Sequence, residues 1–358
     1  MTPRSGKIRV LVVDDSALMR QLIGDILGTD PRIQVVGTAR DGRDALAQIK
    51  ALRPDVVTMD VEMPNMDGLK ALEEIMRTSP LPVIMVSSVT QEGAETTLKA
   101  LSLGCVDFVS KPSGSISLNI RDVGRDIVDK VVAASTAHVR TGGSLLPPKP
   151  PLPRAPEFRR MTPPPSSRRR EIVAIASSTG GPMALNELLP KLPGNFPVPI
   201  VITQHMPKEF TPSFARRLNA ASALEVVEGF EGLTLKPGRV VIAPGGKHLI
   251  LKRRNGAVVC DLSDAPPELS VKPAANIMFR SVAEQYGGNV LCVILTGMGR
   301  DGTDGAIPMH RQGAYLIAES QKTCVVYGMP KAAVDAGIAD EVLPLNEIPE
   351  AMVRNVKG

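Results

Sequence analysis

Two adjacent serines, Ser177 and Ser178, in the stretch IASSTGGP (residues 175–182) are the first candidates for chemistry in this sequence. A nucleophilic serine on a tight strand-to-helix turn needs very small residues two positions before and two positions after it, because backbone and helix crowd the turn. Ser178 has Ala176 and Gly180 at these positions, whereas Ser177 has an isoleucine and a threonine. The spacing favours Ser178 as a nucleophile, but a turn of small residues without chemistry is not excluded by this segment alone.

The glycines of this turn are also compatible with phosphate binding. The helix that we expect to begin near Pro182 directs free N–H groups toward the turn, where they could hold a phosphate or stabilise an oxyanion. A Walker loop is excluded, because the turn has no lysine and lacks the G-x-x-x-x-G-K-[ST] spacing.

Candidates for the general base and for the carboxylate that orients it end two further apolar runs. His205 ends VPIVITQH and Asp301 follows NVLCVILTGMGR, so both should reach the same sheet edge as Ser178. Asp304 competes with Asp301 but lies one turn into the next predicted helix. The chain order of serine, histidine and aspartate differs from that of α/β-hydrolases, but triads are defined by geometry and not by order. The remaining histidines lie in a proline-rich segment, at the start of a predicted strand and within a predicted helix: His138, His248 and His310.

The loop after the run NVLCVILT offers a rival interpretation. Gly297, Gly299 and Gly302 spell G-x-G-x-x-G between a predicted strand and a predicted helix, and Glu319 ends the next predicted strand. This is the pattern of a dinucleotide-binding loop. Asp301 argues against it, because its charge would lie in the loop that must hold a pyrophosphate. Together with the candidate serine and histidine at neighbouring strand ends, it favours a serine hydrolase.

A second group of polar residues follows the apolar runs of the first third of the chain. Asp14 and Asp15 end the first predicted strand, Asp60 the third and Ser87 the fourth, and Lys111 follows the fifth. In a parallel sheet these ends share one edge, where three carboxylates repel one another unless a cation neutralises them. Mg²⁺ is a hard ion that prefers oxygen ligands and fits such a site. A carboxylate beside Mg²⁺ and a lysine can accept a phosphoryl group, and the sequence predicts this chemistry here.

The elements that must position these residues form two alternating series of strands and helices. Residues 1–135 contain five apolar strand-like runs and five helical patterns, the last at about 118–135, which predicts an α/β domain with a doubly wound parallel sheet. The alternation restarts in residues 170–358, where we expect a second doubly wound domain. Its region 224–262 has short runs broken by Gly and Pro, which predict an inserted antiparallel ribbon. The other predicted strands of this domain are 171–176, 198–204, 289–296 and 314–318, and its predicted helices are 183–191, 209–220, 273–286 and 302–312.

Residues 136–169 should link the two domains. The stretch 140–170 contains nine prolines, which cannot join a sheet or continue a helix, so we expect a stiff, partly polyproline II segment. The same stretch carries eight basic side chains and one acidic one, a net charge of +7. Because the whole chain has a net charge of +5, the rest of it has a net charge of −2. A plain spacer is the simplest interpretation, and a docking strip for an acidic partner is the alternative.

The composition excludes several classes of protein. The parts outside the linker are mildly acidic and have three tyrosines, seven phenylalanines and no tryptophan in the whole chain, so they offer no platform for nucleic acid. No apolar run reaches the roughly 18–20 residues that a membrane span needs, and the N-terminus lacks the features of a signal peptide. Four scattered cysteines without a CxxC pair fit a reducing compartment. We therefore expect a cytoplasmic monomer that neither inserts into membranes nor binds nucleic acid.

Residues 7–130 resemble the receiver domain of bacterial two-component response regulators. The motifs VVDDS, MDVEMPNMDG, VSS and KP occur in the order of that family. The resemblance implies a flavodoxin-like fold, Mg²⁺ as a cofactor, phosphorylation of Asp60 by a histidine kinase, and Phe108 as the aromatic switch residue. It also implies phosphoryl contacts from Ser87 and Lys111, and a metal site made of Asp14, Asp15, Asp60 and the backbone carbonyl of Glu62.

The stretches SSTGGP, TQHMP and LTGMGRDG, behind a receiver and a linker, resemble the CheB family of chemotaxis protein-glutamate methylesterases. The resemblance covers nearly the whole chain and implies a Rossmann-like esterase domain without a cofactor. It implies that the substrate is the γ-glutamyl methyl ester on cytoplasmic helices of chemoreceptors, with glutamine deamidation by the same route and sensory adaptation as the result. The implied residues are Ser178 as nucleophile, His205 as general base and acid, Asp301 as its orienting carboxylate, and the amides of Thr179 and Met298 as oxyanion donors.

Control by phosphorylation is expected from the position of both predicted sites at strand carboxyl ends. An unphosphorylated receiver could cover Ser178, and phosphorylation of Asp60 would weaken that contact. Two other function classes are left: a phospho-regulated adaptor with an inactive second domain, and a nicotinamide-dependent enzyme. A DNA-binding output domain is disfavoured by the charge of −2 outside the linker.

Overall fold

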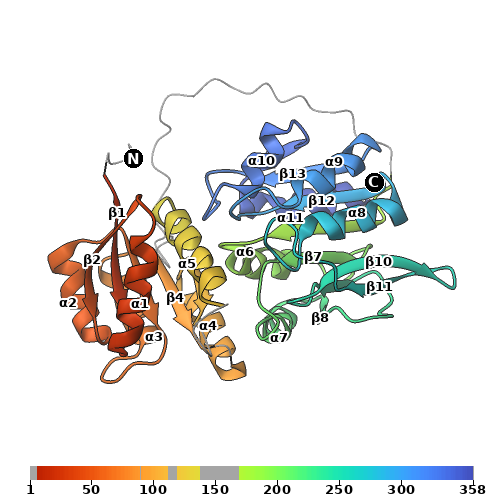
Figure 1. The fold of residues 1–358 in the computed structure, drawn as a ribbon. Coiled ribbons are helices and arrows are strands. Elements are labelled where there is room, and N and C mark those ends of the chain that lie inside the picture. Colours follow the sequence, from red (N-terminus) through yellow and green to blue (C-terminus); the bar gives the residue numbers. More distant parts are fainter. Residues whose placement is uncertain (1–5, 89, 112–118, 138–168, 358) are drawn as a thin grey trace.

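A computed structural model describes residues 6–88, 90–111, 119–137 and 169–357 of the chain. They form two α/β domains, one from the N-terminal third and the other from the C-terminal half (Figure 1). The predicted linker, 136–169, lies almost entirely outside the described residues, so its polyproline II conformation and the exact domain boundaries stay predictions.

The first domain alternates strands and helices, as its apolar periodicity predicts. Its elements are β1 (Ile8–Val13), α1 (Ala17–Gly28), β2 (Ile33–Ala39), α2 (Gly42–Leu52), β3 (Val56–Asp60), α3 (Gly68–Thr78), β4 (Val83–Ser87), α4 (Gln91–Leu103), β5 (Asp107–Ser110) and α5 (Asn119–Ser135). The strands form a parallel sheet in the order β2-β1-β3-β4-β5. The order reverses between β1 and β3, so the carboxyl ends of these strands border the crevice in which such sheets bind ligands.

The second domain is built around a larger parallel sheet. Its elements are β6 (Ile172–Ser177), α6 (Gly181–Leu188), η1 (Leu189–Lys191), β7 (Ile200–Gln204), α7 (Thr211–Ala221), β8 (Glu225–Glu228), β9 (Arg239–Ile242), β10 (His248–Arg254), β11 (Ala257–Ser263), α8 (Ala275–Tyr286), β12 (Val290–Ile294), α9 (Thr303–Arg311), β13 (Tyr315–Glu319), α10 (Met329–Asp335), β14 (Glu341–Leu343), η2 (Leu345–Glu347) and α11 (Ile348–Lys357). Seven strands form the sheet in the order β14-β13-β12-β6-β7-β9-β8. β10 and β11 pair separately as an antiparallel ribbon beside it (Figure 1).

The interpretation of residues 224–262 as one antiparallel ribbon is partly wrong. The run GRVVIAP contains β9, which pairs in parallel with β7 and β8 inside the main sheet, and only β10 and β11 form the ribbon. Three consecutive residues of β9 are apolar and buried, which fits a strand covered on both faces. β10 instead ends in exposed basic residues. The short elements β8, β14, α10 and α11 were also not predicted.

Apolar strands and polar turns position the functional edges of both sheets. β3, β4, β6, β7 and β12 consist entirely of buried residues, as is typical of parallel strands covered by helices. None of the described helices is both long and apolar enough to cross a membrane. In the first domain, four helices begin at a side chain that accepts a backbone N–H: Ser16, Asp41, Asp67 and Thr90.

The two domains pack against each other through α4 and β5 on one side and α6 and α7 on the other (Figure 1). Phe108 in β5 stacks on Phe210, which precedes α7, with ring centroids 4.4 Å apart. Leu101 of α4 and Phe214 of α7 belong to the same buried apolar cluster. The interface therefore has an apolar centre of its own.

Candidate active site

Three polar side chains follow the carboxyl ends of three central strands in the second sheet. Ser178 comes directly after β6, His205 directly after β7, and Asp301 lies in the loop between β12 and α9. β6 pairs in parallel with both β7 and β12, so these ends meet at one edge. The structure thus brings together the serine, histidine and aspartate that the sequence singled out.

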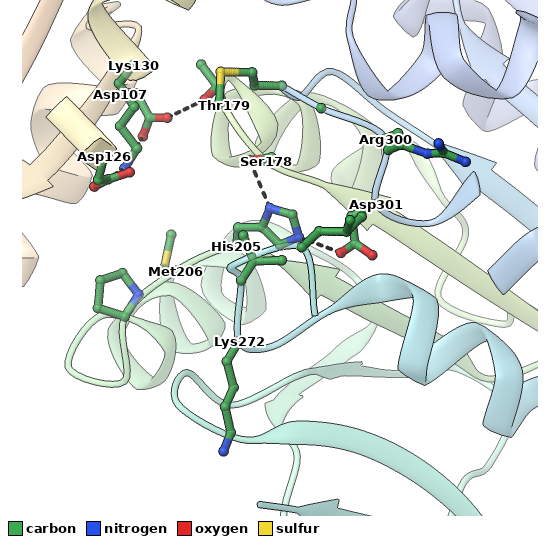
Figure 2. Close-up of a pocket in the computed structure, with 15 residues that line it drawn as sticks. Asp107, Asp126, Lys130, Ser178, Thr179, His205, Met206, Lys272, Arg300 and Asp301 are labelled. Atoms are coloured by element: carbon green, nitrogen blue, oxygen red, sulfur yellow. Dashed lines mark hydrogen bonds and ion pairs between the residues drawn. The ribbon is translucent and has the colours of Figure 1, made fainter. Parts of the chain in front are cut away.

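A continuous chain of hydrogen bonds joins these side chains (Figure 2). His205 Nδ1 lies 3.1 Å from Ser178 Oγ, and His205 Nε2 lies 2.7 Å from Asp301 Oδ2. Because an ionised carboxylate can only accept hydrogen bonds, Nε2 carries the ring proton and donates a hydrogen bond to Asp301. The unprotonated Nδ1 then accepts from the Ser178 hydroxyl, which is the arrangement of a general base beside its nucleophile.

Asp301 is held by backbone amides at the starts of α8 and α9. Its Oδ2 accepts from the Ala275 amide at 2.6 Å, and its Oδ1 accepts from the Asn276 and Gly302 amides at 2.9 and 3.0 Å. Burial acts to raise the pKa of Asp301, but hydrogen bonds from His205 and from the Ala275 and Asn276 amides outweigh it and lower the pKa below its usual 3.8. Asp301 is therefore ionised at neutral pH and keeps the proton on His205 Nε2.

Glycines let the loops around Ser178 approach one another closely. Gly180 has a φ of 78°, and a Cβ at this position would lie 2.5 Å from Val325 Cβ. A Cβ at Gly297 would lie 2.8 Å from Ser178 Cβ. Larger residues at either position would push the neighbouring loops away from the serine, so the small-residue spacing of the turn has a packing cause.

The predicted oxyanion donors, Thr179 and Met298, line the same pocket as Ser178, which has a volume of about 420 Å³. Within the described ranges, neither amide takes part in a backbone hydrogen bond, whereas the Ser178 amide donates to Thr296 O at 3.0 Å. Two uncommitted N–H groups near the nucleophile are what a tetrahedral oxyanion requires. Their role as oxyanion donors stays a prediction.

The side chain of Gln204 fixes the ends of β6 and β7, and sequence reasoning missed it. Its Oε1 accepts from Ser177 Oγ at 2.7 Å, and its Nε2 donates to the carbonyls of Ser178 and His205, each at 3.0 Å. Its place directly before the histidine in TQHMP is the signal that could have drawn attention to it.

Asn276, which is fully buried, joins the starts of α8 and α9 around Asp301. Its Oδ1 accepts from the Gly302 and Gly305 amides at 2.9 and 2.8 Å, and its Nδ2 donates to Glu268 Oε1 at 2.9 Å. No pattern in the sequence distinguishes this asparagine from others near the start of a helix.

The geometry gives the dinucleotide interpretation of the glycine-rich loop no support. Glu319, which that fingerprint assigns to a ribose, is fully buried and accepts from the Thr296 amide at 2.9 Å. The carboxylate of Asp301 lies in this loop and accepts a hydrogen bond from His205 Nε2. The loop serves the serine and histidine instead of presenting a cradle for a pyrophosphate.

The predicted acidic cluster lies at the carboxyl edge of the first sheet. Carboxylate oxygens of Asp14, Asp15 and Asp60 lie within 4.8 Å of one another. Lys111 Nζ donates to Asp60 Oδ2 at 2.7 Å and pairs with Asp14 Oδ2 at 3.2 Å. Burial raises the pKa of Asp60 to about 6, although Lys111 acts in the opposite direction. Lys111 can offset only part of the charge of these three carboxylates, so this oxygen-rich cluster fits a divalent cation such as Mg²⁺.

Two further predicted residues of this edge have partners of their own. Ser87 Oγ donates to Gly93 O in α4 at 3.3 Å. The Glu62 amide donates to Asp60 Oδ1 at 3.4 Å, and the metal contact of the Glu62 carbonyl stays a prediction. To donate to a phosphoryl oxygen, the Ser87 hydroxyl would have to give up its hydrogen bond to Gly93 O in α4.

The first domain covers one side of the pocket around Ser178. Asp107, Asp126 and Lys130 line this pocket together with the serine. Thr179 Oγ1 donates to Asp107 Oδ2 at 2.6 Å, as the dashed line in Figure 2 shows. The residue that follows the candidate nucleophile is therefore tied directly to the first domain.

Comparisons with known proteins match both domains. A family model described as CheB methylesterase matches residues 173–352, and one described as response regulator receiver domain matches residues 10–120. The protein-glutamate methylesterase/protein-glutamine glutaminase of Thermotoga maritima is 47% identical over 349 residues, which cover 98% of each chain. The protein of the same name from Geobacillus kaustophilus is 48% identical over 348 residues, covering 97% of this chain and 98% of the relative. The crystal structure of the Thermotoga maritima CheB methylesterase catalytic domain is 48% identical and has a TM-score of 0.51, covering 52% of this chain and 98% of that one.

Proposed function

This chain belongs to the CheB methylesterase family, and we propose that its second domain hydrolyses the γ-methyl esters of glutamate residues on cytoplasmic helices of chemoreceptors, giving sensory adaptation. The same site deamidates glutamine side chains. The observation that carries this proposal is the chain of hydrogen bonds from Ser178 through His205 to Asp301. A catalytically inactive adaptor would not require a serine, a base and a carboxylate joined by hydrogen bonds in this way.

In the first step, Ser178 Oγ attacks the ester carbonyl carbon while His205 Nδ1 takes the hydroxyl proton. A C–O bond forms and the carbonyl oxygen becomes an oxyanion, which the amides of Thr179 and Met298 stabilise. When the intermediate collapses, the bond to the methoxy oxygen breaks, and this oxygen takes the proton from Nδ1 and leaves as methanol. Between these events Asp301 stabilises the imidazolium and keeps the ring oriented.

Water completes the cycle. His205 Nδ1 takes a proton from a water molecule, the water oxygen bonds to the acyl carbon, and the bond to Ser178 Oγ breaks as the proton returns to the serine. The product side chain is glutamate. With glutamine as substrate the first step releases ammonia, and the second step is unchanged.

Phosphorylation of Asp60 by a chemotaxis histidine kinase controls this esterase in our proposal. Lys111, with its Nζ 2.7 Å from Asp60 Oδ2, offsets charge on the phosphoryl oxygens, and Ser87 contacts them once its hydroxyl leaves α4. When bound, Mg²⁺ supplies further positive charge for phosphoryl transfer. The residues that would hold it are Asp14, Asp15, Asp60 and, through its carbonyl, Glu62.

Strand β5 connects the phosphorylation site to the esterase. Asp107 and Phe108 begin the strand and contact the second domain, and Lys111 directly follows its end. Asp107 acts on the esterase by tying down the side chain of Thr179, whose amide is a proposed oxyanion donor. The docked receiver therefore inhibits through this contact as well as by covering the pocket.

The setting of the reaction follows from its substrate. The receptor helices and the kinase are cytoplasmic, so we place this protein in the cytoplasm, as a monomer. All four cysteines are free and buried, which fits a reducing compartment.

A chain that contains only residues 170–358 should release methanol from methylated receptor without a phospho-donor, at least about tenfold faster than the unphosphorylated full chain. An interface free energy of only about 1.4 kcal/mol is sufficient for a tenfold shift. The shortened chain should fold, because the catalytic domain of the Thermotoga maritima relative has been crystallised by itself. If it were inactive while the phosphorylated full chain worked, inhibition by the docked receiver would be wrong.

Asp107→Ala in the full chain should raise the rate of methanol release without a phospho-donor by about tenfold or more. The substitution removes the hydrogen bond to Thr179 Oγ1, and a bond to a charged group contributes roughly 1.5–3 kcal/mol. Ser102→Ala is the matched control, since it removes the interdomain hydrogen bond from Arg217 but does not touch the pocket. Equal activation by both variants would show that Asp107 has no specific effect on the oxyanion site.

A further inference from the structure

The loop between β11 and α8 presents an exposed apolar side chain beside Ser178. In this loop Glu268 and Val271 close a two-residue hairpin turn: the Glu268 amide donates to Val271 O at 3.2 Å, and the Val271 amide donates to Glu268 O at 3.1 Å. Leu269, at the tip of the turn, is 50% exposed and lines the pocket that contains the serine.

Both residues at the tip of this turn have a backbone conformation that side chains disfavour. The φ angles are 53° at Leu269 and 65° at Ser270. A two-residue turn with positive φ at both central positions is formed most readily by Asn-Gly, and a leucine there is destabilising. Asparagine or glycine at these two positions would make the fold more stable. A strained residue of this kind in a pocket wall suggests a function for its side chain.

The turn is fixed to the frame of the active site. Glu268 Oε1 accepts from Asn276 Nδ2 at 2.9 Å and from Arg280 Nη1 at 3.2 Å, and Glu268 Oε2 pairs with Arg280 Nη2. Asn276 in turn donates its amide to Asp301 Oδ1 at 2.9 Å. Leu269 is therefore held at a defined place relative to the catalytic machinery, which a recognition element requires.

Exposed apolar side chains contribute to the lining of this pocket. Among the described residues, five large hydrophobic side chains are exposed, and two of them, Leu269 and Met298, line this pocket. Lys272 of the same loop points away from Ser178 in Figure 2, and its Nζ donates to Asp264 O at 3.0 Å. Exposed apolar side chains gathered beside a reactive serine favour a protein substrate that brings apolar surface of its own.

We propose that Leu269 is a specificity residue that packs against an apolar side chain of the substrate helix, one turn away from the modified glutamate. The inference rests on the proposed function, in which the substrate glutamate lies on a helix. On a helix, a side chain three or four residues from this glutamate lies on the same face. A small ester has no such neighbour and gains nothing from Leu269.

The test uses Leu269→Asn and its matched control Ser270→Gly in the full chain, activated with Mg²⁺ and acetyl phosphate. Both substitutions suit positive φ, so both variants should melt at or above the wild-type temperature. For each protein, kcat and KM are measured for methanol release from a methylated receptor cytoplasmic fragment and for hydrolysis of p-nitrophenyl acetate. For Leu269→Asn, kcat/KM on the receptor relative to the small ester should fall about tenfold, mainly through KM, because one buried leucine side chain is lost from the complex.

Ser270→Gly should keep the wild-type ratio of the two activities. The inference is overturned if Leu269→Asn also keeps that ratio, or if it loses both activities in equal proportion, since Leu269 would then support the site instead of the substrate. A wild-type enzyme that hydrolyses p-nitrophenyl acetate but releases no methanol from receptor would overturn the proposed function, and the inference with it.

Discussion

Replacing Ser178 by alanine should lower kcat for methanol release by about 10⁴-fold or more, with KM for the receptor nearly unchanged. Alanine removes the oxygen that forms the acyl-enzyme in the proposed mechanism, and it leaves the turn, the pocket and the pair of His205 and Asp301 in place. The measurement is methanol release from a methylated receptor fragment by the full chain activated with a small phospho-donor. A comparison of kcat with KM then separates loss of chemistry from loss of binding.

The adjacent serine provides the control for this experiment. Ser177 is buried, and its Oγ donates to Gln204 Oε1 at 2.7 Å, so it is not available to attack a substrate. Ser177→Ala leaves that acceptor without its partner, which should destabilise the domain by about 1–3 kcal/mol while kcat keeps its order of magnitude. Wild-type activity in Ser178→Ala, or loss of activity in Ser177→Ala alone, would overturn the assignment of the nucleophile.

The parts of the site that the sequence predicts are those fixed by regular structure. The runs that become β6, β7 and β12 are mostly apolar, and a polar candidate follows each of them: Ser178 directly after β6, His205 directly after β7 and Asp301 in the loop after β12. Parallel strands covered by helices place such ends at one edge, whichever strands are neighbours. The pattern thus predicts that the three residues share an edge, and the order β12-β6-β7 brings them within hydrogen-bonding distance.

The parts that the sequence does not predict depend on contacts between distant segments. Asn276 bonds to Gly302 and Gly305, and this depends on how α8 and α9 cross, which no local periodicity encodes. The hydrogen bond from Thr179 to Asp107 joins two domains, so it depends on which surfaces meet. The misassigned β9 has a similar cause, because a run of three buried residues is too short for its pairing partner to be read from its pattern.

Replacing Asp301 by asparagine should lower kcat by about 10³- to 10⁴-fold. Both carboxylate oxygens accept backbone amides, Oδ2 from Ala275 and Oδ1 from Asn276 and Gly302. An asparagine must therefore turn its NH₂ group toward at least one of these donors. The variant cannot reproduce the native set of hydrogen bonds in either orientation of its amide.

The two orientations fail for different reasons. If the NH₂ group replaces Oδ2, it faces His205 Nε2, which must then accept, and the proton moves to Nδ1, where it blocks the transfer from Ser178. If it replaces Oδ1, the tautomer of His205 is kept, but the NH₂ group opposes two amide donors and the negative charge that stabilises the imidazolium is lost. In both cases the imidazole is present and the base is ineffective.

Asp304→Asn is the matched control for Asp301→Asn, because Asp304 is 41% exposed and pairs only with Arg300 among the described residues. Its kcat should equal that of the wild type. Unfolding at several pH values adds a second measurement. The pKa of Asp301 is lowered, so its carboxylate contributes stability that is fully present above the unfolded value of 3.8 and is lost as the pH falls through the folded pKa. The difference in melting temperature between wild type and Asp301→Asn should therefore shrink as the pH falls below about 4. A kcat lost in Asp304→Asn and kept in Asp301→Asn would assign the orienting carboxylate to α9 instead of the loop that precedes it.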